Sequence, residues 1–343
     1  MTTATESLLG ESNAFLEIIE QASRLAPLRK PVLIIGERGT GKELIAHRLH
    51  YLSARWDQSF VTINCATLSE NLLETELFGH EAGSFTGAAK RHQGRFERAD
   101  GGTLFLDELA TTSARVQEKL LRVIEYGEFE RVGGAKALKV DVRLVCATNE
   151  DLPALADRGD FRHDLLDRLA FDVITLPPLR ERREDILMLA AHFAHGMTRE
   201  LGYPLFAGFS RKATQLLLDY PWPGNVRELK NVVERSIYRQ GNPQLPLSEL
   251  VINPFDSPWR PCSRTSLAAT IDEPIQASVS TPPLLPLDLK QAVAEYEINL
   301  LKQAMQQSQY NQRKAAQLLA LSYHQFRGML RKYQLLDSDS DAD

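Results

Sequence analysis

An alternation of short apolar segments with helical ones in the first half of the chain constrains the fold more than any other feature. The apolar segments are six or seven residues long, are rich in Val, Ile, Leu and Phe, and span 31–36, 60–65, 103–108, 142–148 and 171–176. Stretches with a helical period, such as 41–53 and 113–127, lie between them. Short buried strands that alternate with helices predict an α/β fold, with a mainly parallel sheet covered by helices on both faces.

The second half of the chain reads as helices joined by a linker. After the α/β region at 1–177, the sequence shows helical patterns and no strand patterns, over about 183–201, 210–219 and 224–240. These patterns predict a small all-α region at 178–253. Residues 254–288 hold seven of the 17 prolines and little periodic apolar pattern, so we expect a flexible linker. Residues 289–336 are helical again, and 337–343 form an acidic tail.

Charge and cysteine content limit the classes of partner and compartment. The net charge of −5 gives no overall sign of nucleic-acid binding, but residues 289–336 carry seven Lys or Arg against two Glu, a local net charge of +5. Two of the three cysteines lie in apolar strand segments, which is typical of a reduced compartment. The N-terminus lacks the pattern of a signal peptide and no stretch approaches 18 apolar residues, so we expect a cytoplasmic protein without membrane insertion.

A glycine-rich loop joins the first apolar strand to the following helix. It reads GERGTGKE, with the spacing of a phosphate-binding loop. Glycines let backbone N–H groups turn inward around phosphates, the helix N-terminus adds a favourable dipole, and the lysine reaches the β- and γ-phosphate oxygens. The alternative is a plain glycine turn between strand and helix. The predicted ATP-binding residues here are Gly36, Glu37, Arg38, Gly39, Thr40, Gly41, Lys42 and Glu43.

The strand at 103–108 ends in two carboxylates, Asp107 and Glu108. They follow the glycine loop by about 70 residues and stand at the C-terminal edge of the predicted sheet, where ligands collect in such folds. Asp107 suits the shell of a magnesium ion bound with the ATP phosphates, and Glu108 suits polarisation of the attacking water. The pair therefore predicts ATP hydrolysis with Mg2+.

Six motifs together resemble the AAA+ domain of the bacterial enhancer-binding proteins, the ATP-dependent activators of sigma-54 RNA polymerase. They are GERGTGKE, ELFGHEAGSFTGA, GGTLFLDE, VRLVCATN, FRHDLLDRL and WPGNVRELKN, and the likeness covers about residues 5–255. The resemblance implies an AAA+ ATPase with a helical lid at 178–253, a ring that is usually a hexamer, and remodelling of the closed promoter complex. Two alternatives are a DNA-binding regulator that no longer hydrolyses ATP and a remodelling ATPase, such as a clamp loader or chaperone, with another target.

The resemblance also assigns roles to single positions. Asn64 resembles the switch residue that holds the catalytic glutamate, although a strand-end Asn can also cap a turn. Glu43 stands where other phosphate loops place a Ser or Thr for magnesium, and it is the residue of this family. The remaining assignments are sensor I at Thr148 and Asn149, arginine fingers that act on a neighbouring subunit at Arg162 and Arg168, and sensor II at Arg227.

The segment GSFTGA has neither a helical nor a strand period and carries one bare aromatic residue. It resembles the family signature GAFTGA, with Ser84 in place of the usual alanine. The resemblance implies a glycine-hinged loop at the pore of the ring, where Phe85 and Thr86 touch sigma-54. The predicted sigma-54 contacts are Gly83, Ser84, Phe85, Thr86, Gly87 and Ala88.

Trp56 lies among charged and polar residues between a helix and the next strand. It either caps the core or is an exposed aromatic anchor for a regulatory protein partner.

The C-terminal segment 311–333 predicts a helix, a tight turn and a second helix. The first helix spans about 312–319, and Ser322 can cap the second, on which Phe326 and Leu330 share a face. This pattern resembles the helix-turn-helix domains of the factor-for-inversion-stimulation type, which place the second helix in the major groove of upstream activating DNA. A plain amphipathic helical pair is the alternative. The predicted DNA contacts are Ser322, Tyr323, His324, Gln325, Arg327 and Arg331.

Two further expectations concern this segment. Ala320 stands where the turn often has a glycine, and alanine fits there if the turn keeps a negative φ. The helix at 289–307 has apolar residues in phase, and we expect it to make a dimer contact for a palindromic site.

Overall fold

The computed structural model describes residues 8–85, 88, 90–242, 244–257, 259–260, 289–308, 311–333 and 335. The chain divides into two compact units, Met1–Pro258 and Trp259–Asp343. Most of the predicted linker, the whole acidic tail, and Thr86 and Gly87 of the GSFTGA segment lie outside the described residues.

A five-stranded parallel sheet forms the centre of the first unit. Its strands are β1 (Val32–Ile35), β2 (Phe60–Asn64), β3 (Thr103–Asp107), β6 (Arg143–Thr148) and β7 (Val173–Thr175), in the order β2-β3-β6-β1-β7. All four neighbouring pairs are parallel. The five predicted strands and the α/β fold class are therefore confirmed.

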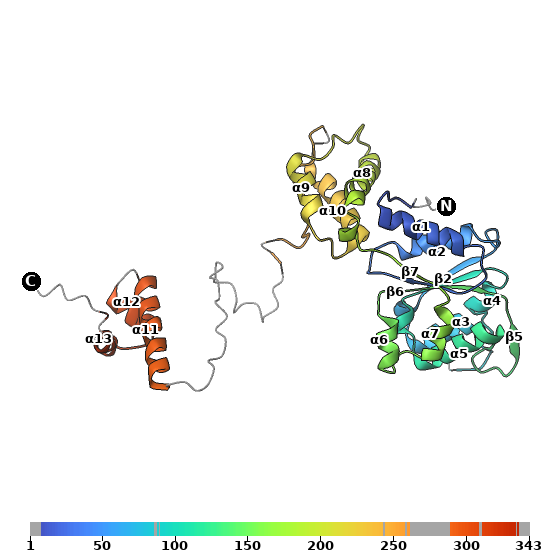
Figure 1. The fold of residues 1–343 in the computed structure, drawn as a ribbon, viewed down its shortest axis with the longest axis horizontal. Helices are drawn as coiled ribbons and strands as arrows, with labels where there is room; N and C mark the ends of the chain where they lie inside the picture. The colour runs from blue at the N-terminus through green and yellow to red at the C-terminus, as the bar shows by residue number, and fades with distance from the viewer. Residues whose placement is uncertain are drawn as a thin grey trace, which may run out of the picture. The chain divides into compact units, whose positions relative to one another are not determined.

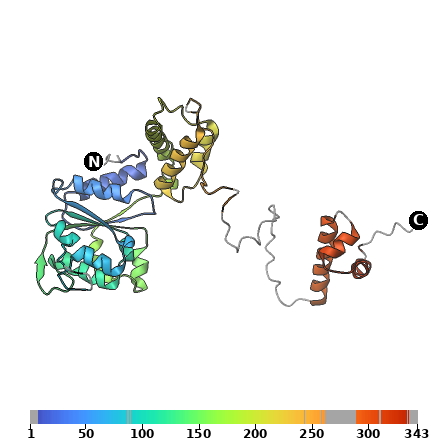
Figure 2. The ribbon, with the colours of Figure 1, turned by 180° about the vertical axis from the view of Figure 1, so that it is seen from behind.

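Helices cover both faces of this sheet. In Figures 1 and 2, α1 and α2 lie on one face and α3, α5, α6 and α7 on the other. The helices of this region are α1 (Asn13–Leu25), α2 (Lys42–Tyr51), α3 (Glu70–Phe78), α4 (Arg95–Arg98), α5 (Ala114–Tyr126), α6 (Leu152–Asp157) and α7 (His163–Leu169), with short 3-10 turns at Cys65–Thr67 and Leu109–Thr111.

Burial on both faces explains why the strands are apolar runs. Successive side chains of a strand point to opposite faces. On β6, Val145 and Ala147 belong to the core that contains α1 and α2, whereas Leu144 and Cys146 belong to the core that contains α3, α5 and α7. A strand buried on both sides has no polar face, so the sequence shows no alternation.

A short antiparallel hairpin after α5 was not predicted. It consists of β4 (Glu128–Glu130) and β5 (Ala137–Lys139). The turn between its strands carries the residues Arg131–Gly134, which lie against the start of the GSFTGA segment.

Three helices form the lid: α8 (Arg183–Glu200), α9 (Arg211–Asp219) and α10 (Asn225–Gln240), after the 3-10 turn Leu179–Glu181. They match the predicted helical stretches and share a core around the buried Trp222. The buried carboxylate of Asp185 on α8 accepts hydrogen bonds from the backbone N–H groups of Glu11 and Ser12 and from the Ser12 hydroxyl, at 2.7, 2.9 and 2.7 Å. The lid is thereby tied to the segment that leads into α1.

The second unit contains α11 (Leu289–Gln307), α12 (Gln312–Leu318) and α13 (Tyr323–Lys332), with a small core that includes Phe326 and Leu330. Ser322 caps α13 in a capping box with Gln325, as the sequence predicted for the cap.

The condition under which alanine would fit this turn, a negative φ at Ala320, is not met, because its φ is +53°. The Leu321 N–H donates to the Ala316 carbonyl at 2.9 Å, and the Ala320 N–H donates to the Gln317 carbonyl at 3.1 Å. This is the Schellman pattern, which ends a helix by placing the residue after the cap in the left-handed region. The turn needs that conformation whichever residue occupies it.

None of the helices in the described parts of the chain is long and apolar enough to cross a lipid bilayer.

Candidate nucleotide site and partner loop

The glycine loop has the conformation that its sequence predicts. Gly39 and Gly41 have φ of +78° and +100°, in the left-handed region that favours glycine. The helix α2 starts at Lys42 without a side-chain cap, and an uncapped helix start is a suitable site for an anion. The buried Lys42 ammonium donates to the carbonyls of Gly36 and Glu37, at 2.9 and 3.4 Å. These contacts hold the positive charge at the loop.

Burial lowers the pKa of Lys42, while the nearby carboxylates of Glu108 and Asp107 act in the opposite direction. The ammonium therefore lies among the residues at the carboxyl edge of the sheet. Asp107 ends β3 directly opposite Asn64 on β2.

The sequence analysis paired Asn64 with Glu108, whereas in the structure the Asn64 side chain contacts Asp107. Because Asn64 faces Asp107 in the register, its side-chain amide donates to the Asp107 carboxylate at 3.0 Å. The Glu108 N–H donates to the other Asp107 oxygen, also at 3.0 Å. Glu108 has a φ of +53°, a strained conformation that is common at functional sites. Among the described residues, none pairs with the Glu108 side chain.

The described residues contain no group of three or more His, Cys, Asp or Glu side chains that could hold a metal ion. A magnesium ion at Asp107 would therefore depend on phosphate oxygens and water for most of its ligands, as is usual at nucleotide sites.

The sensor I candidate lies against the glycine loop. Thr148 is buried at the end of β6, next to Ile35 in the register, and its carbonyl accepts a hydrogen bond from the Gly36 N–H at 3.2 Å. The Thr148 hydroxyl accepts from the Glu150 N–H at 3.0 Å. Asn149 follows at the same edge of the sheet and is partly exposed.

The two arginine-finger candidates lie apart from this group. Arg162 precedes α7 and pairs with Asp164 at 2.7 Å, and Arg168 pairs with Glu125 at 2.9 Å. Both side chains are exposed. In the described part of the chain neither contacts the glycine loop, so the structure does not bring them to the nucleotide site of their own subunit.

The sensor II candidate does reach the loop. The Gly39 carbonyl accepts from the N–H groups of Val226 and Arg227, at 3.0 and 3.4 Å, where α10 begins. Two further lid residues, Arg180 and Asn225, contact the Glu37 carboxylate and were missed by the sequence analysis. An Asn that follows Pro-Gly favours a left-handed turn, which is the only signal for Asn225. The sequence holds no comparable signal for Arg180.

The GSFTGA segment rises from a paired base. His80 and His92 exchange backbone hydrogen bonds at 3.2 and 3.0 Å, and the Glu81 N–H donates to the Val132 carbonyl at 3.1 Å. Phe85 is 45% exposed, and its ring centroid lies 5.0 Å from that of His80. The part of the segment that the structure describes therefore places an aromatic side chain at the surface, above an ordered base.

An ion cluster holds this base to the hairpin turn. The buried Arg131 guanidinium pairs with Glu81 at 2.6 Å and with Glu97 at 2.5 Å. The Arg131–Glu97 pair lowers the pKa of the Glu97 carboxyl. A Cβ on Gly133 would lie 2.5 Å from the Ser84 Cβ, so the hairpin turn and the GSFTGA segment are in close contact.

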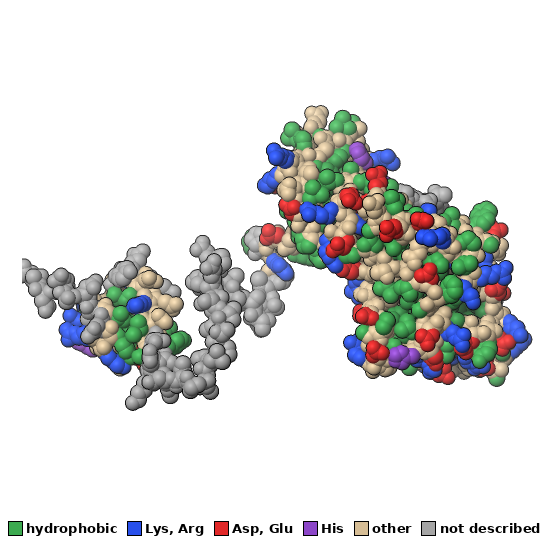
Figure 3. All heavy atoms as spheres, viewed as in Figure 1, with side chains coloured by type: hydrophobic (Ala, Val, Ile, Leu, Met, Phe, Trp, Pro, Cys, Tyr) green, Lys and Arg blue, Asp and Glu red, His purple; other side chains and the backbone are tan. Residues whose placement is uncertain are grey.

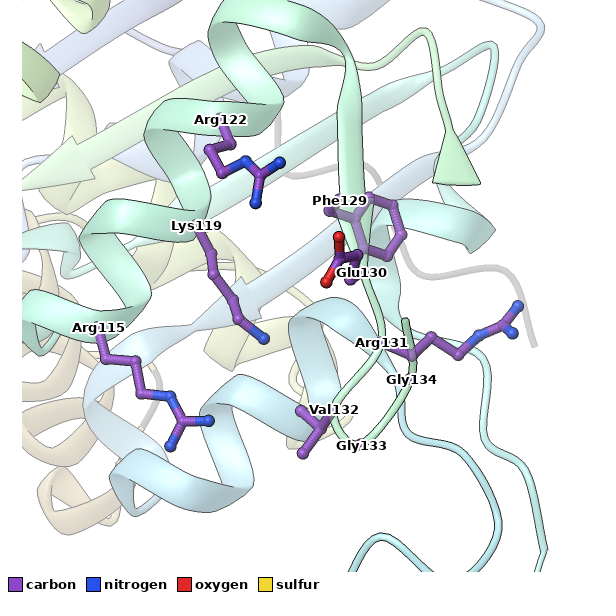
Figure 4. Close-up of a pocket in the computed structure, with 9 residues that line it drawn as sticks. All are labelled: Arg115, Lys119, Arg122, Phe129, Glu130, Arg131, Val132, Gly133 and Gly134. Carbon is purple, nitrogen blue, oxygen red and sulfur yellow. The ribbon is translucent and has the colours of Figure 1, made fainter. Parts of the chain in front are cut away.

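A pocket of about 190 Å3 lies between α5 and the hairpin turn. Figure 4 shows the residues that line it. Arg115, Lys119 and Arg122 extend from α5 toward it, whereas the Arg131 side chain points away from them. None of the residues that line this pocket belongs to the nucleotide group.

Trp56 is 63% exposed, which rules out the alternative that it caps the core. Tyr51 and Leu52 nearby in the chain are also exposed.

In the second unit, Phe326 and Leu330 are buried, and His324, Arg327 and Arg331 are exposed. Lys and Arg side chains gather on one side of this unit (Figure 3). Ser322 and Gln325 are also exposed, and both take part in the capping box. Tyr323 is partly exposed, and the Arg313 guanidinium lies 5.9 Å from its ring.

Comparison with known proteins assigns this architecture to a family. Residues 8–175 match the sigma-54 interaction domain, and residues 180–253 match the AAA+ ATPase lid domain. The chain is 61% identical over 336 residues to the Psp operon transcriptional activator of Escherichia coli (strain K12), with 98% of this chain and 100% of that protein covered. The chain belongs to the sigma-54-dependent transcriptional activators.

Other relatives of this sigma-54 activator include regulatory protein AtoC of Escherichia coli (strain K12), which is 39% identical over 97% of this chain and 68% of its own length. Nitrogen fixation protein AnfA of Azotobacter vinelandii is 50% identical, and the match spans only 43% of that protein. Among solved structures, NtrX from Brucella abortus in complex with ATP aligns with a TM-score of 0.67 and 31% identity, covering 95% of this chain and 69% of NtrX. The chain is thus an AAA+ ATPase that activates transcription with sigma-54.

Proposed function

We propose that this sigma-54 activator binds ATP and Mg2+ at the glycine loop, hydrolyses ATP between subunits of a ring, and remodels the closed promoter complex through its GSFTGA loop. The observation that carries this proposal is the convergence of Lys42, Asp107, Glu108 and Arg227 around the glycine loop.

The residues present fit ATP and magnesium. The Lys42 ammonium is held by loop carbonyls, and phosphate oxygens would replace them as acceptors. Asp107, oriented by Asn64, would join the magnesium shell, and Glu108 would orient the attacking water. ATP supplies the phosphoryl bond whose hydrolysis releases free energy. Thr148, Asn149 and Arg227 would report the state of the phosphates to the rest of the domain.

The exposed positions of Arg162 and Arg168 support action on a neighbouring subunit. A ring, with six subunits as the expected number, would bring these guanidinium groups to the next subunit's ATP. Each must leave its present carboxylate partner, Asp164 or Glu125, to do so.

The GSFTGA loop would carry Phe85 and Thr86 to sigma-54. Phe85 offers an apolar anchor on an ordered base, and glycine hinges would let the loop move. A loop that is raised or lowered with the nucleotide state is a switch of a known kind.

The second unit would bind upstream DNA. Exposed His324, Arg327 and Arg331 on α13 offer donors to bases and phosphates, and Val293 and Tyr296 leave an exposed apolar face on α11 for a second copy. A dimer of this unit would read a palindromic site.

The operon and the regulator follow from the likeness to the Psp operon activator. We propose that the target is the phage shock operon, and that phage shock protein A restrains the ATPase by contact with Trp56. A cytoplasmic location fits this role.

Two experiments test the proposal. Lys42→Ala should abolish binding of a fluorescent ATP analogue, and normal affinity in that variant would refute the nucleotide site. Wild-type protein trapped with ADP and a metal fluoride should retain purified sigma-54 in a pull-down, and a trapped protein that does not would refute the loop's role.

A further inference from the structure

The carboxamide of Asn225 joins three parts of the first unit. Its Nδ2 donates to a carboxylate oxygen of Glu37 at 3.0 Å and to the carbonyl of Arg38 at 3.1 Å. Its Oδ1 accepts from the Leu179 N–H at 2.8 Å. Asn225 is fully buried, and its bond to the Leu179 N–H is shielded from water, which strengthens it. One side chain therefore connects the glycine loop, the entry to the lid and the start of α10.

Arg180 also binds the Glu37 carboxylate. Its two terminal nitrogens bind the Glu37 oxygens at 2.6 and 3.0 Å, in a bidentate geometry. Both side chains are partly exposed, and an exposed pair alone contributes little to stability. Together with the buried Asn225 amide, however, Arg180 fixes Glu37 in one orientation. The two contacts also lower the pKa of Glu37.

The glycine loop in turn caps the lid helix. The first N–H groups of α10 have no side-chain cap, and the Gly39 carbonyl accepts two of them. A Cβ on Gly39 would lie 2.4 Å from the Gly224 carbonyl, so the two backbones are in direct contact. The loop and the helix that carries Arg227 can therefore not shift independently while these bonds persist.

The turn before α10 is strained in a way that suits this contact. Trp222 and Asn225 have φ of +50° and +52°, in the left-handed region that L-residues rarely adopt. Such residues persist where their surroundings require them. The Asn225 conformation directs its amide to the loop.

We propose that Asn225 and Arg180 are positioning residues for nucleotide binding. By binding Glu37, they hold the glycine loop in a fixed position relative to the first turn of α10. The Lys42 ammonium and the Arg227 guanidinium then lie ready for the same nucleotide. The inference rests on the proposed function of this site. Neither residue needs to touch the nucleotide for this role.

The test is Asn225→Asp in the full-length chain, because Asp has the same shape and tolerates the left-handed conformation. The change removes two donors and places a second carboxylate about 3 Å from Glu37. The Kd for a fluorescent ADP analogue should rise at least about 10-fold above that of the wild type at pH 8. The KM for ATP should rise with it, whereas kcat at saturating ATP should fall less, because the water-activating Glu108 is unchanged.

A pH series separates positioning from general damage. Two carboxylates this close cannot both stay ionised easily, so the ratio of variant to wild-type Kd should fall from pH 8 toward pH 5.5. The charged groups around this contact are Glu37, Arg38, Lys42, Arg180, Arg227 and Glu228. All are shared with the wild type, so the ratio isolates the new carboxylate.

A second test places a hydrogen-bond donor at position 37 instead of position 225. In Asn225→Asp combined with Glu37→Gln, the Gln amide can donate to the Asp carboxylate. The Kd should fall below that of Asn225→Asp alone, but not to the wild-type value, because the ion pair of Arg180 with Glu37 is lost. The matched control is Asn242→Asp, an exposed asparagine beyond the other end of α10, and it should bind the analogue like the wild type.

A Kd within about twofold of the wild type for Asn225→Asp would overturn the inference. So would a loss of affinity that is equal at every pH and is not relieved by Glu37→Gln, since that result indicates general damage. The proposed function is judged separately: if Lys42→Ala also binds the analogue normally, the nucleotide site itself is wrong.

Discussion

Replacement of Arg131 by Ala tests how the base of the GSFTGA segment is held. Arg131 is only 6% exposed and makes three hydrogen bonds to two carboxylates, one to Glu81 and two to Glu97. The two partners precede it in the chain by 50 and 34 residues. The substitution therefore breaks the side-chain link between the hairpin turn, the loop base and α4.

The magnitude follows from the burial of each partner. Removal of one member of a buried ion pair costs about 3–5 kcal/mol, because a charge is left uncompensated. Glu97 is 14% exposed and loses two bonds, whereas Glu81 is 38% exposed, so its pair contributes at most about 1 kcal/mol. Arg91, at 3.7 Å from Glu97, remains and offsets part of the loss. We expect the free energy of unfolding to fall by about 2–4 kcal/mol.

The effect should depend on pH. Arg131 lowers the pKa of Glu97, so the stabilisation is present above the unfolded-state pKa, near the ordinary value of 4.5, and is lost as pH falls through the folded-state pKa. Wild type and Arg131→Ala should therefore differ less in stability in acid than at pH 7.

Urea denaturation at pH 7 measures the loss, and hydrogen exchange at the amides of Glu81 and Val132 locates it. Both amides should exchange faster in Arg131→Ala. A loss below about 1 kcal/mol with unchanged exchange at these amides would refute the account of how the loop base is held.

Three further predictions concern separate parts of the chain. Ala320→Gly should stabilise the second unit by about 1 kcal/mol, because glycine adopts the left-handed turn without strain; the amides of α13 should exchange about fivefold more slowly, and unchanged exchange would contradict this. Arg143→Lys should lower the free energy of unfolding by about 1–3 kcal/mol, since one ammonium cannot replace the guanidinium bonds to the carbonyls of Leu25, Ala26 and Leu49; urea denaturation measures the loss, and an unchanged midpoint would count against it. Thr86→Ala should keep ATP hydrolysis but lose open-complex formation; equal loss of both, measured by phosphate release and promoter melting, would contradict the separation of the two roles.

The sequence predicted the strands and lid helices because burial leaves a strong local pattern there. Strands covered on both faces are continuous apolar runs, and β6 is buried along its whole length. The cap of α13 was predicted for another local reason, because Ser322 directly precedes the helical pattern.

The hairpin and the ion cluster could not be predicted locally. The strand β4 has only three residues, and two of them are charged. A segment this short and polar shows no strand pattern in the sequence. Arg131 is typical of a surface residue in sequence, and it is buried only because partners far along the chain fold against it. Residues whose role depends on distant partners give no periodic signal.

The backbone conformation of one turn and the register of one strand pair were also not predicted. Ala320 takes a positive φ because the Schellman hydrogen bonds of the turn require it, whatever the residue prefers. Asn64 was expected beside Glu108, but the strand register places it opposite Asp107. The register depends on both strands, so the sequence of β2 alone does not give the residue opposite Asn64.

Open-complex formation at a sigma-54 promoter tests the central claim most directly, namely that ATP hydrolysis at the sheet edge drives the GSFTGA loop against sigma-54. The full-length chain, sigma-54 polymerase and promoter DNA are mixed with ATP or with a non-hydrolysable analogue, and promoter melting is recorded. The account predicts melting with ATP only, and no melting for Lys42→Ala with either nucleotide. Equal melting with the non-hydrolysable analogue would contradict it.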